Sequence, residues 1–144
     1  MAGINLVHRH RLRVLYAHTD RMNVVYYSRY YEYFESARSA LLRDIQFPYR
    51  QMEREGIFLP VVESHCRYYR PATYEDLLTI ETRLEEEPKV KIRLSYRVYK
   101  DGEEQPIAEG YTVHSFVNQD RRPVEVPEAF LACVRKYAGQ LLED

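Results

Sequence analysis

The sequence lacks tryptophan, has only two cysteines among its 144 residues, and contains no long apolar run. Cys66 and Cys133 lie far apart and form no C-x-x-C pair, so we expect structural thiols rather than a zinc or dithiol redox centre. No apolar stretch approaches the roughly 20 residues that a transmembrane helix needs, and the N-terminus shows no signal segment. We therefore expect a cytoplasmic protein without membrane insertion.

Several catalytic motifs are also missing. The chain has no G-x-S-x-G elbow, no P-loop and no G-x-G-x-x-G, which argues against serine hydrolases, P-loop NTPases and dinucleotide-binding proteins. Its 21 basic and 22 acidic residues balance to a formal net charge of −1, which argues against a general nucleic-acid binder. An anionic ligand would need a local basic patch. We expect no cofactor and no metal.

Tyrosine is abundant, with 14 copies, and 45% of the residues are apolar. A chain of this length can bury about 70% of its unfolded surface, so we expect one domain over residues 1–144. Many tyrosines suit half-buried positions, where the ring packs and the hydroxyl stays wet or finds a partner. Pocket walls and subunit interfaces fit that description, and Tyr-rich faces on a small sheet favour oligomers.

Helical periodicity is clearest over residues 28–43. One stripe of this segment carries Tyr30, Phe34, Ala37 and Leu41, which predicts an amphipathic helix of about four turns with a core-packed face. Pro48 ends it, and a short second helix over residues 49–55 is closed by Gly56. A C-terminal helix is predicted from Pro127 through Leu142.

Alternating residues predict five strands. They cover residues 8–16, as an edge strand, then 61–68, 78–85, 89–98 and 105–117, with Asp101-Gly102 as a hairpin turn. The fold class is α+β, with an antiparallel five-stranded sheet wrapped around the long helix. Ala108 and Gly110 are small enough to let that helix lie close to the sheet.

His8 and His10 share one face of the first predicted strand. Two histidines at this spacing could bind a metal, but no third ligand is visible nearby. We therefore expect solvated histidines.

Asp20 precedes an apolar, aromatic run and so lies close to the predicted start of the long helix. Backbone N–H groups are unpaired there and the helix dipole is positive, which favours a charged carboxylate and could polarise a nearby carbonyl. An aspartate in front of a helix is, however, more often an N-terminal cap.

The same stretch resembles the motif of hotdog-fold acyl-CoA thioesterases. The resemblance is carried by Thr19-Asp20, the run Val24-Val25-Tyr26-Tyr27, Tyr30 and Phe34-Glu35-Ser36-Ala37-Arg38, and later by Tyr68-Tyr69-Arg70-Pro71-Ala72 and Asp76-Leu77-Leu78-Thr79-Ile80. It spans about residues 8–120 and is nearest to the 4-hydroxybenzoyl-CoA thioesterase-like branch, within it the Tol–Pal-associated subgroup. Asn23 replaces the usual Gly, a mild departure because Asn tolerates the left-handed conformation, and Tyr27 replaces a frequent His or Asn.

The resemblance implies a hotdog fold and thioester hydrolysis. Asp20 would be the nucleophile or the general base, and the N–H of Tyr27, or of a neighbour, would bind the thioester oxygen. Val24, Val25 and Tyr26 would shape the acyl pocket, although packing at the helix start is an equally good role for them. Glu35 and Glu63 are alternative carboxylates. Glu35 is better explained as a surface partner of Arg38.

Coenzyme A carries phosphates, which call for cations near the site. Lys89, Lys91 and Arg93 share a strand face, and Arg121-Arg122 follows the last strand. A solvated strand face is the better explanation for any one of them.

The resemblance further implies a homodimer or homotetramer with the site between subunits, acting on an aromatic or short-chain acyl-CoA or on an acyl carrier protein thioester. One alternative is a non-hydrolytic acyl-thioester binding protein or a dehydratase, although His18 has no evident partner for dehydratase chemistry. The other is a structural, dimeric interaction module.

Overall fold

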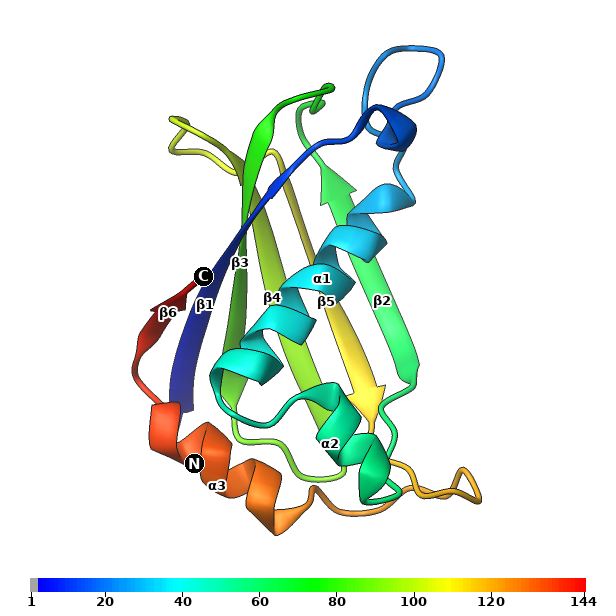
Figure 1. Cartoon of the computed structure of the whole chain (residues 1–144), viewed down its shortest axis with the longest axis vertical. Helices are drawn as coiled ribbons and strands as arrows, with labels where there is room; N and C mark the ends of the chain where they lie inside the picture. The colour runs from blue at the N-terminus through cyan, green and yellow to red at the C-terminus, as the bar shows by residue number, and fades with distance from the viewer. Residues whose placement is uncertain (1–2) are drawn as a thin grey trace.

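A computed structural model describes residues 3–144 as one sheet wrapped around a long helix (Figure 1). The strand order is β2-β5-β4-β3-β1-β6. The strands are β1 (Gly3–Arg13), β2 (Val61–Tyr68), β3 (Leu77–Glu86), β4 (Lys91–Lys100), β5 (Ala108–Ser115) and β6 (Leu141–Glu143). The helices are the 3-10 turn η1 (Tyr16–His18), α1 (Arg29–Asp44), α2 (Tyr49–Arg54) and α3 (Glu128–Tyr137).

Helix α1 packs its predicted stripe into the inner face of the sheet, and all four stripe residues are buried. The Phe34 ring stacks on Tyr96 of β4 with ring centroids 4.3 Å apart. A Cβ on Gly110 would lie 2.8 Å from the Phe34 ring and 2.3 Å from the His65 carbonyl oxygen. The predicted close approach of helix and sheet at Gly110 is therefore confirmed.

The central strands β3, β4 and β5 pair antiparallel in the predicted alternation, with apolar side chains facing α1. Several boundaries differ from prediction. Strand β1 covers Gly3–Arg13 rather than residues 8–16, β5 covers Ala108–Ser115 rather than residues 105–117, and α3 ends at Tyr137 rather than at Leu142. Gly139, with φ of 80°, turns the chain after α3 so that β6 pairs in parallel with β1 as a sixth strand.

Strand β1 is not the edge strand that was expected over its whole length, because β3 lies on one side and β6 covers Val7–Arg9 on the other. Its inward residues Ile4, Leu6 and His8 are buried. The expectation of a solvated histidine is thus wrong for His8. Sequence alternation placed His8 and His10 on one face but did not show that α1 covers it.

Strand β2 forms the other edge of the sheet and pairs only with β5. Every residue of β2 except Cys66 is exposed. The outer edge thus presents backbone N–H and C=O groups that no other strand within residues 3–144 pairs, the usual situation of an edge that can pair with another chain.

Neither cysteine forms a disulfide, and both Cys66 and Cys133 are half-buried free thiols. No helix within residues 3–144 combines the length and apolarity needed to cross a membrane.

Candidate active site

Asp20 lies in a small hairpin between η1 and α1. Thr19 and Val25 form an antiparallel bridge, and the Asp20 N–H donates to the Val24 carbonyl at 3.0 Å. The Asn23 N–H donates back to the Asp20 carbonyl at 2.9 Å. Asn23 has a φ of 64°, the left-handed conformation that its replacement of Gly requires. Backbone hydrogen bonds therefore fix the position of the Asp20 main chain.

The hairpin is attached to a segment far along the chain. Val24 forms an antiparallel bridge with Thr73, and the Val25 N–H donates to the Ala72 carbonyl at 2.8 Å. The side chain of Val25 is 6% exposed and belongs to the core, whereas Val24 is half-buried. Packing alone explains Val25, and a role for either valine in an acyl pocket stays a prediction.

The Asp20 carboxylate faces the loop rather than the helix end. Its Oδ1 accepts the Met22 N–H at 2.8 Å, and the side chain is partly exposed. Helix α1 begins only at Arg29, with Ser28 as its N-cap. The alternative role of Asp20 as a cap of α1 is therefore wrong, and one Asp20 oxygen remains without a protein donor among residues 3–144.

The backbone just before α1 has free donors. Within the described residues, the N–H groups of Tyr27 and Ser28 donate to no protein acceptor, whereas the Tyr26 N–H donates to the His18 carbonyl at 2.9 Å. The Tyr68 hydroxyl of β2 donates to the Tyr27 carbonyl at 3.1 Å, which fixes this peptide unit from the other side. Free N–H groups beside a helix start can bind the oxygen of a polarised carbonyl.

Aromatic rings surround these donors. The Tyr26 and Tyr27 rings lie 4.6 Å apart, and both residues are exposed. Hydrogen bonding to Tyr27 raises the pKa of Tyr26, and the nearby charge of Asp20 acts in the same direction. Behind them, Tyr30 contacts Tyr68 edge-on at 5.1 Å, and burial raises the pKa of Tyr30 to about 12. The hydroxyls of Tyr26 and Tyr30 are therefore held in their neutral form.

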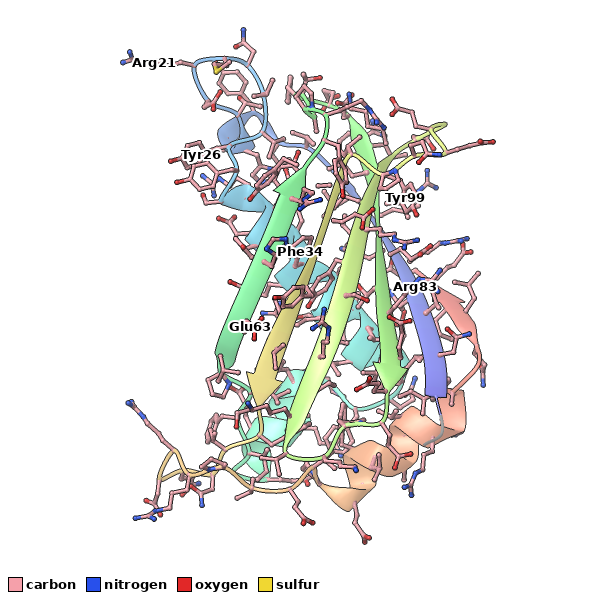
Figure 2. All side chains as sticks on the ribbon, turned by 180° about the vertical axis from the view of Figure 1, so that it is seen from behind. Arg21, Tyr26, Phe34, Glu63, Arg83 and Tyr99 are labelled. Atoms are coloured by element: carbon pink, nitrogen blue, oxygen red, sulfur yellow. The ribbon has the colours of Figure 1, made fainter. Side chains whose placement is uncertain are left out.

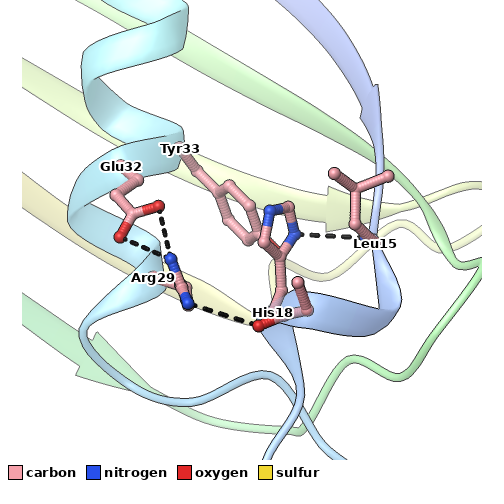
Figure 3. Close-up of polar contacts among 6 residues, drawn as sticks. Leu15, His18, Arg29, Glu32 and Tyr33 are labelled. Atoms are coloured by element: carbon pink, nitrogen blue, oxygen red, sulfur yellow. Dashed lines mark hydrogen bonds and ion pairs between the residues drawn. The ribbon is translucent and has the colours of Figure 1, made fainter.

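His18 is the last residue of η1, and its side chain lies beside Tyr33 in the first two turns of α1 (Figure 3). Its Nδ1 accepts the Leu15 N–H at 3.1 Å and lies 3.0 Å from the Tyr33 hydroxyl. Arg29 binds Glu32 at 3.0 Å and the Ala17 carbonyl at 3.3 Å. Burial, and then the charge of Arg29, lower the pKa of His18. Its Nδ1 is thus occupied as an acceptor, and the imidazole is held neutral.

The predicted phosphate-binding residues do not lie near Asp20 in the same chain. Lys91 and Arg93 share the exposed face of β4, but Lys89 precedes the strand. Lys91 is at the start of β4, and Lys100 is at its end. Lys100 pairs with Leu78, which in turn pairs with Leu12 at the end of β1. The chain continues from that end of β1 to the Asp20 hairpin, so Lys100 and not Lys91 lies at the Asp20 end of the sheet. A ten-residue strand separates these ends by about 30 Å. Arg93 instead lies over the Tyr111 ring at 4.0 Å.

The alternative carboxylates lie on other surfaces. Glu35 is exposed on α1, and Glu63 on β2 accepts the Tyr111 hydroxyl. No ion pair joins Glu35 to Arg38 in the part of the chain that the structure describes, so that predicted pair is wrong. Arg38 is turned inward, close enough to Tyr96 and His114 to affect their pKa values.

Two large grooves lie away from Asp20. One of about 530 Å³ follows the outer face of the sheet, where Glu63 and Arg83 are seen in Figure 2, and its lining includes Arg67, Arg83, Arg93 and Tyr111. The other, of about 620 Å³, lies beside α2 and is lined by Tyr49, Phe58, Leu59 and Val117 among others. Neither contains Asp20, whose hairpin is open to solvent in the single chain.

Sequence reasoning missed the contribution of the segment around Ala72. The sequence of this segment resembles a family motif, but the sequence alone does not show that Ala72 and Thr73 form backbone contacts with the Asp20 hairpin. Only the folded sheet brings the two segments together. The hydrogen bond from Tyr68 to Tyr27 was missed for the same reason.

Comparison with known proteins agrees with this geometry. Residues 14–134 match the thioesterase-like superfamily. A putative esterase from Aquifex aeolicus is 32% identical over 126 residues, covering 88% of this chain and 96% of the relative. The putative acyl-CoA thioesterase YneP from Bacillus subtilis is 30% identical over 125 residues, covering 86% and 90%.

A solved structure of a 4-hydroxybenzoyl-CoA thioesterase variant, in complex with 4-hydroxybenzoyl-CoA, superposes with a TM-score of 0.81. It covers 89% of this chain and 98% of that one at 22% identity, a likeness of fold. The expected hotdog fold is thereby confirmed, and the expectation of a hydrolase is confirmed at the level of the family. The chain belongs to the thioesterase-like superfamily of hotdog proteins.

Proposed function

We propose that this protein hydrolyses acyl-CoA thioesters and that Asp20 is its central catalytic residue. The observation that carries the proposal is the pairing of a partly exposed carboxylate with free N–H groups at Tyr27 and Ser28, all positioned by one backbone-fixed segment. An anion and an oxyanion donor in one place are what acyl transfer requires. Relatives named as acyl-CoA thioesterases support the choice of thioester.

The thioester oxygen would accept the Tyr27 N–H, or that of Ser28, and its bond to carbon would be polarised. Removing one such donor typically lowers the rate by about 10²–10³. Asp20 would then attack the carbonyl carbon, expelling the thiolate and forming a mixed anhydride that water hydrolyses. Alternatively, it would take a proton from a water that attacks the same carbon. The geometry is compatible with both routes.

The acyl group would lie against Val24, Val25 and Tyr26 and the neighbouring tyrosine rings. These walls suit an aromatic or short-chain acyl group, since flat or small groups pack well on tyrosine faces. The thiol carrier would be coenzyme A, with the phosphopantetheine of an acyl carrier protein as the other candidate.

A second copy of the chain would complete the site. The β2 edge is unpaired and exposed, and exposed apolar side chains gather around the hairpin, namely Leu15, Tyr16, Met22, Tyr26, Tyr27 and Tyr74. Antiparallel pairing of two β2 edges would place the opposite end of the partner sheet beside this hairpin. That arrangement would let Lys89, Lys91 and Arg93 of one copy approach the substrate of the other.

Non-hydrolytic acyl-thioester binding and dehydration remain the second candidate function. A dehydratase needs a histidine beside its carboxylate, yet the Nδ1 of His18 already accepts the Leu15 N–H, and the hydrogen-bond partner of Asp20 is Met22. These contacts favour hydrolysis.

The test is thiol release from aromatic, short-chain and long-chain acyl-CoAs by the wild-type protein and by Asp20→Asn, at matched oligomeric state. We expect the substitution to lower turnover by about 10²–10⁴ without lowering the melting temperature, because it keeps the side-chain shape and removes the charge. Glu35→Gln and Glu63→Gln are controls that should keep turnover. Full activity in Asp20→Asn would contradict the proposal, and absence of hydrolysis by the wild type would favour the binding function.

A further inference from the structure

A second cluster of possible ligand atoms lies far from Asp20, near the C-terminal end of α1. His8 of β1, Asp44 at the end of α1 and Asp144 after β6 each offer one atom, and these three atoms lie within 4.8 Å of one another. The His8 Nε2 lies 2.6 Å from the Asp44 Oδ2. Three segments distant in sequence therefore converge here, because β6 lies beside β1 (Figure 1).

His8 is an unusual member of this cluster. Its side chain is 0% exposed, and its Nδ1 is buried without a hydrogen-bond partner among residues 3–144. The ring therefore makes its polar contact through Nε2 alone, which lies beside the Asp44 carboxylate. Nε2 is thus the ring nitrogen that can bind a ligand shared with the carboxylates.

The surroundings favour a cation. Asp44 and Asp144 bring two carboxylates that are only 35% and 31% exposed. Asp44 is the last residue of α1, where the helix dipole is negative. Their partial exposure also leaves a path for an ion to enter.

His10 supports the cluster from outside. Its Nδ1 lies 2.7 Å from the Asp144 Oδ2, and its Nε2 lies 2.9 Å from the Ser36 hydroxyl oxygen. A histidine that hydrogen-bonds a ligating carboxylate orients it, as such outer partners do in metal sites. His10 is thus a positioning residue.

We propose that His8, Asp44 and Asp144 form a binding site for a divalent transition-metal ion such as Zn²⁺. One imidazole nitrogen and two carboxylate oxygens, with water in the fourth position, match the ligand types and number that Zn²⁺ accepts. Bonds of about 2.0–2.1 Å place tetrahedral ligand atoms about 3.3 Å apart. The close His8–Asp44 contact would open by about 0.7 Å, which rotation of the Asp44 side chain can supply.

Such a site would act as a clamp on the fold. It would join β1, the end of α1 and the segment after β6. The 16-residue helix α1 separates it from the Asp20 hairpin by about 24 Å. Bound metal should therefore raise the melting temperature and leave thioester turnover unchanged.

The first measurement is calorimetric titration of ZnSO₄ into the full chain, purified without a polyhistidine tag and stripped with a chelator. We expect one ion per chain. Asp44→Asn should lower the affinity at least tenfold, and His10→Gln should lower it by about 10–100-fold. Glu143→Gln is the matched control, since it removes the same charge next to Asp144, and it should bind as the wild type does.

The second measurement compares melting temperatures with Zn²⁺ and with chelator. Zn²⁺ should raise the melting temperature of the wild type and of Glu143→Gln, but not that of Asp44→Asn. A melt of Asp44→Asn in chelator verifies that the variant folds. Absence of Zn²⁺ binding by the wild type, or equal affinity in Asp44→Asn, would show that the cluster is a set of hydrogen-bonded pairs only.

Discussion

Polar groups at the start of helix α1 and polar groups packed against its middle differ in whether they have hydrogen-bond partners. Before the first turn of α1, the N–H groups of Tyr27 and Ser28 have no acceptor within residues 3–144, and Asp20 is partly exposed. Midway along α1, the Nε of Arg38 is buried without a partner among residues 3–144, but three buried polar side chains of the facing strands β4 and β5 are paired with one another. The Tyr96 hydroxyl lies 2.7 Å from the Thr112 hydroxyl, which lies 2.9 Å from the His114 Nε2.

The unpaired groups at the start of α1 are available to bind a ligand, whereas the paired groups at its middle stabilise the fold. The His114 Nδ1 lies 3.0 Å from the Leu59 carbonyl, so both ring nitrogens have partners. An unpaired polar group beside solvent can still form a hydrogen bond to a ligand. The groups of a buried pair already form their hydrogen bonds with each other. Changes midway along α1 should therefore affect folding, and changes near Asp20 should affect turnover.

The largest effect that would test this division is on pH stability. Burial lowers the pKa of His114 from 6.5 to about 4. Between pH 6.5 and pH 4, His114 is therefore protonated in the unfolded chain but neutral in the folded one. The folded state keeps its full stability above pH 6.5 and loses part of it as the pH falls toward 4. The loss amounts to about 3 kcal/mol.

Urea unfolding between pH 7 and pH 4.5 measures this dependence. His114→Gln keeps a donor and an acceptor but cannot titrate, so its stability should fall less over the same range. Equal slopes in the two proteins would show that His114 is not responsible. The charge of Arg38, which faces His114 from α1, also lowers the pKa of His114.

The next effect concerns the contact of α1 with the sheet. Gly110→Ala would place a Cβ against the Phe34 ring and the His65 carbonyl, and backbone cannot yield as a side chain can. We expect a loss of about 2 kcal/mol of unfolding free energy, measured in urea, with turnover of the folded fraction unchanged.

Gly102→Ala is the control for Gly110→Ala. Gly102 has a φ of 81° and open space around its Cβ position, so its cost is backbone strain of about 1 kcal/mol. A Gly110→Ala protein as stable as the wild type would mean that α1 packs more loosely than the structure shows.

The smallest expected effect is on kcat and concerns the residues just before the first turn of α1. Tyr68→Phe removes the hydroxyl that binds the Tyr27 carbonyl, which should loosen the peptide unit that joins Tyr27 to Ser28 and carries the Ser28 N–H, one of the two proposed oxyanion donors. We expect kcat to fall about fivefold, near 1 kcal/mol, with little change in KM or in melting temperature. Tyr69→Phe, on an exposed neighbour, is the control and should keep kcat. Equal rates in both variants would remove Tyr68 from the site.

The sequence predicted what depends on local periodicity. The core stripe of α1 from Tyr30 to Leu41 and the Asp101-Gly102 turn are confirmed because both follow from neighbouring residues. The position of Asp20 before the helix was also visible. Its proposed catalytic role is supported by the family likeness and by the unpaired N–H groups of Tyr27 and Ser28.

The errors concern contacts between distant segments. Asp44 and Asp144 reach His8 only after α1 and β6 are placed against β1, so no inspection of β1 alone could supply them. Arg38 was assigned to Glu35 by spacing, yet the sheet offers it Tyr96 and His114 instead. Tertiary contacts outweighed a surface ion pair that is worth only a few tenths of a kcal/mol.

The bridge from Val24 to Thr73 has a consequence for the order of folding. The Asp20 hairpin precedes α1 in the chain, but its support arrives only after β2 and the turn before β3 have been synthesised and placed. Closing so long a loop is entropically slow, so the reactive segment should be among the last parts to gain protection from hydrogen exchange. During synthesis, the chain could thus bind an acyl group only after Thr73 had been made and placed beside Val24.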